Sequence, residues 1–169
     1  MRKVILNVAM SLDGLIEGPK GEYDWCFTDD DYGMTEFLNR IDAVFYGRKS
    51  YEMMMNTGDG ANPFQQKKSY VFTNSVAEFS GCEVVSGDVV AKVKSVKASE
   101  GKDIWLFGGA SLTTTLLNHK LVDELLLAVH PIVLGRGKAM FETDGRIQTK
   151  LIASKPYPSG LVSLHYEVI

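Results

Sequence analysis

Several features that mark other protein classes are scarce or absent in this sequence. Cysteine occurs only twice, at Cys26 and Cys82, without the Cys-x-x-Cys or Cys/His spacing of a zinc site and without a disulfide framework. No apolar run is long enough to span a membrane, and the short run after Lys3 lacks the cleavage pattern of a signal peptide. We therefore expect a protein of a reducing, cytoplasmic compartment with no metal site and no membrane partner.

An excess of one charge is also absent. The 18 basic and 21 acidic residues give a net charge of −3 without long runs of one sign, so we expect no nucleic-acid partner. The pattern Gly-x-Gly-x-x-Gly does not follow the first apolar segment, which argues against an ordinary Rossmann fingerprint. With 169 residues and 45% hydrophobic composition, the chain suits one core, and we expect a single domain over residues 1–169.

What the sequence does contain is an alternation of strand-like and helix-like segments. Helical spacing of apolar residues, such as Phe37, Leu38 and Ile41, separates short apolar runs rich in β-branched and aromatic residues. The runs are Val4 to Met10, Ala43 to Tyr46, Tyr70 to Phe72, Glu83 to Val85 and Ile104 to Phe107. This order predicts an α/β fold with a central, mostly parallel sheet flanked by helices. Residues 147–154 and 161–168, joined by a Pro/Gly-rich turn, predict a C-terminal antiparallel hairpin.

Two predicted strand-to-helix junctions carry glycine. Gly47-Arg48-Lys49-Ser50 precedes a helix expected to begin near Tyr51, and Gly108-Gly109-Ala110-Ser111 precedes a second helix. Glycine lets a phosphate approach the backbone, and helix N-termini offer unpaired N–H groups and a positive dipole end. The simpler alternatives are a helix capped by Ser50 and a tight turn at the two glycines. Two such junctions in one domain favour a site for a dinucleotide pyrophosphate.

Taken in order, these segments resemble the dihydrofolate-reductase-like superfamily, most closely the branch containing the reductase domain of riboflavin-biosynthesis deaminase-reductases. The resemblance covers nearly the whole chain. It is carried by Ala-Met-Ser-Leu-Asp-Gly at 9–14, by residues 42–52, by Gly-Gly-Ala-Ser-Leu at 108–112, by Val-Asp-Glu-Leu at 122–125 and by residues 131–137. Together these segments imply a dihydrofolate-reductase-like fold.

The resemblance also implies NADPH as the cofactor and assigns positions to it. Ala9 and Ile16 would line the nicotinamide edge. The phosphates would be held by Gly47, Arg48, Lys49 and Ser50 and by Gly108, Gly109, Ala110, Ser111 and Leu112, and the adenosine ribose would lie beside Thr73, Asn74 and Ser75. No acidic residue stands there to hold a ribose 2′-hydroxyl, which favours NADPH over NADH. Asn74, Ser75, Lys67 and Lys68 are the candidate donors to the 2′-phosphate.

The substrate side matches the family less well. Asp31 stands about where folate reductases place a pocket carboxylate, with Trp25 shortly before it. Such a carboxylate could bind an aminopyrimidine ring and assist proton delivery, and the alternative is that Asp31 caps a helix. Asp13 is either a substrate contact implied by the family or ordinary turn chemistry. The segment from Asn56 to Pro63 has no arginine to anchor a substrate tail.

The function that follows is reduction of a conjugated C=N or C=O bond of a small pyrimidine- or pterin-like molecule by NADPH. The family implies a reductase similar to 5-amino-6-(5-phosphoribosylamino)uracil reductase of riboflavin biosynthesis, with dihydrofolate or pterin reduction as the alternative. A non-catalytic nucleotide-binding domain of the same fold and a flavin-binding protein are the other hypotheses. The apolar run from Leu125 to Val133, together with pairing in the related reductases, predicts a homodimer.

Overall fold

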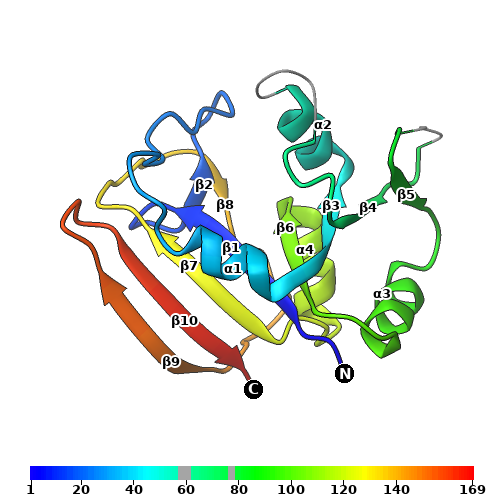
Figure 1. The fold of residues 1–169 in the computed structure, drawn as a ribbon. Coiled ribbons are helices and arrows are strands. Elements are labelled where there is room, and N and C mark those ends of the chain that lie inside the picture. Colours follow the sequence, from blue (N-terminus) through cyan, green and yellow to red (C-terminus); the bar gives the residue numbers. More distant parts are fainter. Residues whose placement is uncertain (57–61, 76–78) are drawn as a thin grey trace.

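The computed structural model describes residues 1–56, 62–75 and 79–169, which form one large sheet with helices on both sides (Figure 1). The helices are α1 (Met34–Arg40), α2 (Arg48–Asn56), α3 (Val89–Ala98) and α4 (Ala110–Asn118). The strands are β1 (Val4–Met10), β2 (Leu15–Glu17), β3 (Ile41–Gly47), β4 (Lys68–Phe72), β5 (Cys82–Val85), β6 (Asp103–Gly108), β7 (Glu124–Val129), β8 (Lys138–Ala139), β9 (Thr149–Pro156) and β10 (Val162–Val168). None of the described helices is long and apolar enough to cross a membrane.

Eight strands form the main sheet in the order β5-β4-β3-β6-β1-β7-β10-β9. The first six pair in parallel, whereas β10 pairs antiparallel with both β7 and β9. The short strands β2 and β8 form a separate antiparallel pair. This topology confirms the predicted fold class, a mostly parallel sheet ending in an antiparallel hairpin.

Apolar side chains on the two faces of the sheet make two separate cores. Phe37 of α1 and Tyr51 of α2 pack with Trp105 of β6 on one face. On the other face, α3 and α4 cover the sheet, as Val93 and Leu116 show. Because successive side chains of a strand point to opposite faces, a strand covered on both faces must be apolar throughout. This explains the nearly continuous apolar runs in β1, β3 and β6.

The structure shifts two expected boundaries. Ile41, which has helical spacing with Phe37, is the first residue of β3, because α1 ends at Arg40. The helix expected from Tyr51 begins at Arg48, so Ser50 lies inside the first turn of α2, and the alternative in which Ser50 caps this helix is wrong. The short pair of β2 and β8 had no recognisable sequence pattern. Residues 57–61, most of the arginine-free segment, lie outside the described residues.

The side on which the chain adds its next strand to the sheet changes between β3 and β6. It leaves β3 through α2 toward β4 on one side, and leaves β6 through α4 toward β7 on the other. Both helices therefore begin at the carboxyl ends of neighbouring strands. In open α/β sheets, ligands bind outside the carboxyl ends of the strands at such a switch point. The topology thus places the candidate site at this edge.

Candidate functional site

A cavity of about 1030 Å³ lies on the sheet face that carries α1 and α2. Its walls come from both helices and from β1, β6, β7, β9 and β10, and one end reaches the carboxyl ends of β1 and β6. This volume is at the upper end of the range that proteins use to hold drug-sized ligands. The cavity can therefore hold a reactive cofactor ring together with a small substrate.

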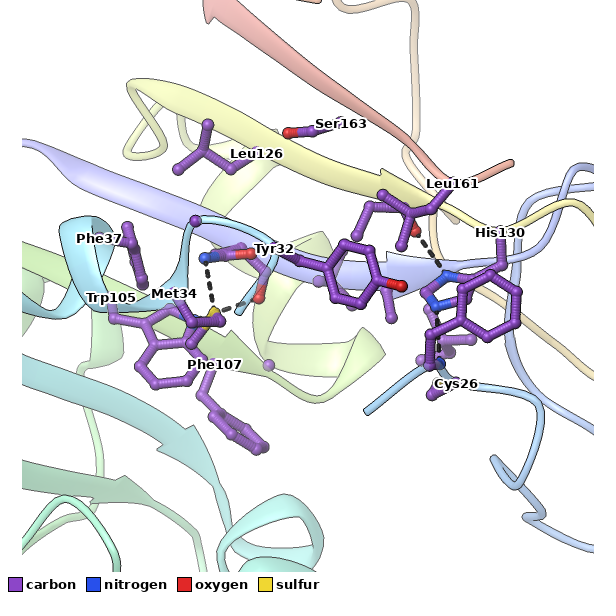
Figure 2. Close-up of a pocket in the computed structure, with 18 of the residues that line it drawn as sticks. Cys26, Tyr32, Met34, Phe37, Trp105, Phe107, Leu126, His130, Leu161 and Ser163 are labelled. Atoms are coloured by element: carbon purple, nitrogen blue, oxygen red, sulfur yellow. Dashed lines mark hydrogen bonds between the residues drawn. The ribbon is translucent and has the colours of Figure 1, made fainter. Parts of the chain in front are cut away.

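Aromatic and sulfur-containing side chains form much of the cavity wall. Figure 2 shows Phe37, Met34, Trp105 and Phe107 gathered on one side, with His130 and Cys26 on the other. The rings of Phe37 and Trp105 meet edge to face with centroids 5.3 Å apart, and Trp105 is fixed because its Nε1–H donates to the carbonyl of Asn7 at 3.1 Å. Such a rigid apolar wall suits a flat ring and excludes water from it.

The two glycine junctions predicted from the sequence lie side by side. A Cβ atom built on Gly47 would stand 3.5 Å from the amide nitrogen of Gly109, and one built on Gly109 would stand 2.9 Å from Oγ of Ser50. The peptide between Gly108 and Gly109 is cis, and Gly108 has φ of +117°. The structure therefore brings the ends of β3 and β6 together, as a shared phosphate site requires, and any side chain at Gly109 would intrude on it.

The start of α4 has polar groups without hydrogen-bond partners among the described residues. Gly109 occupies the N-cap position and offers no side chain to the free amides of the first turn. The hydroxyl of Thr113, in the same turn, is buried and has no hydrogen-bond partner among the described residues. Unpaired donors at a helix N-terminus attract anions. The free N–H groups of this first turn can therefore bind an anion.

The third predicted cofactor segment follows β4, the next strand along. Oγ1 of Thr73 lies 2.8 Å from Oγ of Ser75 and accepts the N–H of Ser75 at 3.1 Å, which makes a compact polar turn. The two lysines suggested for the 2′-phosphate are at the opposite end of β4. Nζ of Lys67 donates to the carbonyls of Leu38 and Ile41, and Lys68 pairs with a glutamate. Of the donors that the sequence suggested, Asn74 and Ser75 lie at this turn.

Of the predicted nicotinamide and substrate contacts, Ala9, Ile16 and Asp31 line the cavity together with Ser50, Gly108 and Gly109. Asp31 lies before α1 rather than inside it. Its Oδ1 accepts the hydroxyl of Thr35 at 2.6 Å and the N–H of Thr35 at 3.0 Å, while Oδ2 accepts the N–H of Gly33 at 3.1 Å. These bonds, that of the Thr35 hydroxyl first, hold the pKa of Asp31 below its usual range. Asp31 is therefore a carboxylate at neutral pH with little spare capacity as an acceptor.

Asp13 and Trp25 are not among the described residues that line the cavity. The carboxylate of Asp13 accepts the hydroxyl of Ser11 and the N–H groups of Leu134 and Gly135, which lowers its pKa to about 2. Asp13 thereby ties the loop after β1 to the loop after β7. Trp25 packs its ring edge to face with His130, at a centroid distance of 5.3 Å. Trp25 therefore contacts a residue that lines the cavity, whereas Asp13 joins two loops.

Sequence reasoning gave His130 no role, yet this residue holds the loop that covers the cavity. Its Nδ1 lies 3.0 Å from the carbonyl of Ala128, so Nδ1 carries the proton, and Nε2 accepts the N–H of Phe27 at 3.1 Å. Burial lowers the pKa of His130, which favours this neutral form. Burial also raises the pKa of the nearby Cys26 to about 11, with Asp24 adding to the effect, so that Cys26 stays a thiol.

A buried carboxylate was also missed. Glu124, only 3% exposed, accepts Lys3 Nζ at 2.6 Å through Oε1, and both Arg40 Nη1 and His165 Nε2 at 2.8 Å through Oε2. Burial acts to raise the pKa of Glu124, but the hydrogen bonds from Arg40, Lys3 and His165 outweigh it and hold the pKa at about 2. Arg40 and His165 line the cavity. No local pattern could reveal this cluster, because its members come from four separate segments.

Comparison with known proteins agrees with this architecture. The family model described as "RibD C-terminal domain" matches residues 2–163. The protein YyaP of Bacillus subtilis is 41% identical over 98% of this chain and 94% of its own length.

Three solved structures share the fold. A Shewanella sp. PV-4 protein assigned by name to riboflavin biosynthesis superposes with a TM-score of 0.87 at 23% identity, over 100% of this chain and 99% of that chain. The deaminase/5-amino-6-(5-phosphoribosylamino)uracil reductase of Thermotoga maritima gives a TM-score of 0.75 at 16% identity, over 99% of this chain and 57% of that one. Dihydrofolate reductase of Enterococcus faecalis, solved with NADP(H), gives 0.73 at 18% identity over 98% and 94%.

Proposed function

This chain belongs to the RibD C-terminal domain family, and on that premise we propose that it is an NADPH-dependent reductase of a conjugated C=N or C=O bond in a small heterocyclic molecule. The observation that carries the proposal is the close approach of the two glycine junctions, because it brings the N-termini of α2 and α4 together beside the cavity. A dinucleotide needs such a site for its pyrophosphate and a neighbouring apolar cavity for its reactive ring.

The residues present fit this cofactor. The close approach of Gly47 to Gly109 leaves the backbone accessible, the first turn of α4 lacks a capping side chain, and Thr113 has an unsatisfied hydroxyl. When bound, NADPH supplies a hydride from its nicotinamide ring. Ala9 and Ile16 would border that ring, and the segment Thr73–Ser75 would border the ribose and its 2′-phosphate.

The protein's own contribution is to bind and orient the acceptor. The aromatic wall around Trp105 holds a flat ring and keeps water away from the reacting atoms. Asp31, ionised beside the cavity, can accept one hydrogen bond from an amino group of the acceptor. The family and the fold support an acceptor similar to the ribosylaminopyrimidine of the uracil reductases, and a reaction in which the chain supplies no nucleophile.

The direct test is a thermal-shift comparison of NADPH, NADH, FMN and FAD, followed by NADPH oxidation with pyrimidine, pterin and quinone acceptors. We expect NADPH to raise the melting temperature most, because a ligand at a hundred times its Kd stabilises a protein by about 2.7 kcal/mol. Stabilisation by FMN instead of NADPH would favour a flavin-binding protein. NADPH binding without oxidation by any acceptor would favour a nucleotide-binding domain that does not turn over.

A further inference from the structure

Asn7 places an amide group on the sheet side of the cavity. Side chains of a strand alternate between the two faces, so Ile5, Asn7 and Ala9 of β1 share the face that carries α1. Asn7 and Ala9 both line the cavity, and Asn7 is partly buried. A side-chain amide has two N–H donors and one carbonyl acceptor. The partners of these groups therefore decide what the cavity can bind at this point.

The side-chain amide of Asn7 is only weakly satisfied within the protein. Its Nδ2 donates to Sδ of Met34 at 3.7 Å, and a thioether sulfur is a weak acceptor with no hydrogen to give. This contact fixes the orientation of the amide, because Oδ1 could not form a hydrogen bond with Met34. One N–H group and Oδ1 of Asn7 are left without a partner among the described residues.

The side chains next to Asn7 do not supply the missing partners. Leu126, directly opposite on β7, is apolar. The indole N–H of Trp105 donates to the backbone carbonyl of Asn7, not to its side chain. His165 lies beyond Leu126 in the same row, two strands from Asn7 and about 10 Å away. The free edge of the Asn7 amide is therefore open to whatever occupies the cavity.

This open amide makes the cavity selective among flat rings. A ring that covers Asn7 removes water from the amide, and a polar group that loses water without gaining a hydrogen bond costs free energy. A ring edge with a carbonyl beside an N–H satisfies Oδ1 and the free N–H together, in the paired manner by which an asparagine binds the edge of adenine. A ring without such an edge leaves both groups of Asn7 unpaired.

Asn7 is also close to the position predicted for the nicotinamide. Ala9 follows two residues later on the same face of β1, which is a separation of about 6.7 Å along the strand. The aromatic wall around Trp105 borders the same part of the cavity. The ring that binds Asn7 and the atom that accepts the hydride must therefore belong to one ring, or to two rings that are fused or directly joined.

We propose that Asn7 determines acceptor specificity: its carboxamide recognises a cyclic amide, an N–H beside a C=O, on the edge of the flat heterocycle that receives the hydride. The proposal rests on the reductase function and names the chemical group by which the acceptor is chosen. Asp31 cannot recognise this edge, because an ionised carboxylate only accepts and has no hydrogen for the carbonyl. Asn7 binds and orients the ring and takes no part in proton transfer.

The test compares two flat probes that differ in one group. Lumazine carries cyclic-amide N–H groups, and in 1,3-dimethyllumazine methyl groups replace them. Titration calorimetry gives the affinity of each probe for the wild-type protein, for Asn7→Leu and for Asn118→Leu. The last variant makes the same change at the end of α4, at a residue that is not among the described residues lining the cavity.

We expect the preference for lumazine over its dimethyl form to fall roughly tenfold in Asn7→Leu and to stay unchanged in Asn118→Leu. Because the methyl groups crowd the site equally in every variant, a change in this ratio reports only the contact with Asn7. An equal ratio in the wild type and in Asn7→Leu would overturn the proposal, as would a wild-type protein that binds neither probe. Weaker NADPH binding in Asn7→Leu with an unchanged ratio would assign Asn7 to the cofactor and also overturn it.

The reductase function is tested separately, by NADPH-induced stabilisation and NADPH oxidation in the wild type. Their failure would overturn that function, while a lumazine preference lost in Asn7→Leu would still support the recognition by Asn7. If Asn7→Leu does not fold, nitrogen NMR of the wild-type protein decides. Lumazine should shift the side-chain amide signal of Asn7 and leave that of Asn118 in place, and an unmoved Asn7 signal would overturn the proposal.

Discussion

At the scale of single residues, the hydrogen bonds around Asp31 set what that carboxylate can do. Three of its acceptor positions are filled by Thr35 and Gly33, and the resulting low pKa keeps it charged over the whole neutral range. Asp31 therefore holds the start of α1 and lines the cavity, while its contact with a substrate stays a prediction.

Replacing Asp31 by Asn separates these roles. We expect NADPH to bind as in the wild type and hydride transfer to the acceptor to slow by roughly tenfold, the loss typical of one hydrogen bond to a charged group. Single-turnover oxidation of NADPH with the acceptor measures this directly. A rate equal to that of the wild type, with a lowered melting temperature, would leave Asp31 only its role at the helix start.

Arg48 is the first residue of α2, and its guanidinium forms an ion pair with Glu52, one turn further on, at 3.1 Å. An exposed pair of this kind contributes about 0.5 kcal/mol to stability. We expect Arg48→Ala to weaken NADPH binding roughly tenfold while the melting temperature of the free protein stays nearly constant. Titration calorimetry gives the affinity. Glu52→Ala is the matched control, because it breaks the same ion pair and keeps the cation; equal loss in both variants would make the effect structural.

His130 makes the stability of the folded protein depend on pH. Its pKa is lowered in the folded state, so the unfolded chain binds the proton more readily. The sign follows from linkage: the stabilisation is fully present above about pH 6.5 and is lost as the pH falls through the lower pKa of the folded state. We expect urea unfolding to show lower stability at about pH 5.5 than at about pH 7.5, and the difference to shrink in His130→Gln. An identical pH dependence in both proteins would refute this account.

At the scale of elements, the junction between β6 and α4 needs glycine at two adjacent positions for two different reasons. Gly108 has φ of +117°, which other residues rarely adopt, whereas Gly109 has ordinary extended angles, with φ of −71° and ψ of 176°. A methyl group on Gly109 would meet Oγ of Ser50, a side-chain atom that can rotate away. The backbone requirement therefore lies at Gly108 and the requirement for open space lies at Gly109.

We expect Gly109→Ala to abolish the stabilisation by NADPH with little loss of stability in the free protein, because the methyl group occupies the phosphate approach. Gly108→Ala should lower the stability of the free protein by about 1 to 3 kcal/mol. Melting curves with and without saturating NADPH separate the two effects. The double variant Gly109→Ala/Ser50→Ala removes the contact with Ser50, and any stability that it restores is due to that contact. Normal NADPH stabilisation of Gly109→Ala would refute the phosphate site.

At the scale of the whole molecule, the main sheet has two edge strands, β5 and β9. Strand β9 lies at the outer edge of the sheet (Figure 1). It is exposed along its whole length, and Leu151 and Ile152 are about half exposed. Most of the apolar run that suggested a homodimer, Leu125 to Val129, lies in β7 between β1 and β10, where pairing inside one subunit explains it. If the chain forms a homodimer, the exposed edge of β9 is the surface that offers unpaired backbone groups and apolar side chains.

We therefore keep the prediction of a homodimer and propose that the two chains pair through β9. Light scattering at micromolar concentration should give twice the mass of one chain. Leu151→Lys should reduce the mass to that of the monomer, because a charge on the edge opposes pairing between sheets, while Leu12→Lys, at an exposed apolar residue in the loop after β1, should leave it unchanged. A monomeric mass for the wild type would show that the prediction of a homodimer is wrong.

The sequence by itself predicted the fold class, because alternation of apolar runs and helical spacing is a local property that is typical of a parallel sheet with crossover helices. It also predicted both glycine junctions, since the need for glycine at a close backbone approach is visible in a few adjacent residues. It misplaced Ile41 and the start of α2, where the same residues suit a helix or a strand and neighbouring packing decides.

Only the tertiary structure decided which distant residues meet. The contact between Gly47 and Gly109 depends on the pairing of β3 with β6, and the cluster of Glu124 with Lys3, Arg40 and His165 depends on the order of strands and on where α1 ends. Such contacts leave no periodic signal in a single sequence. The charge state of Glu124 and the neutral form of His130 follow from burial and hydrogen bonding, which exist only once the chain has folded.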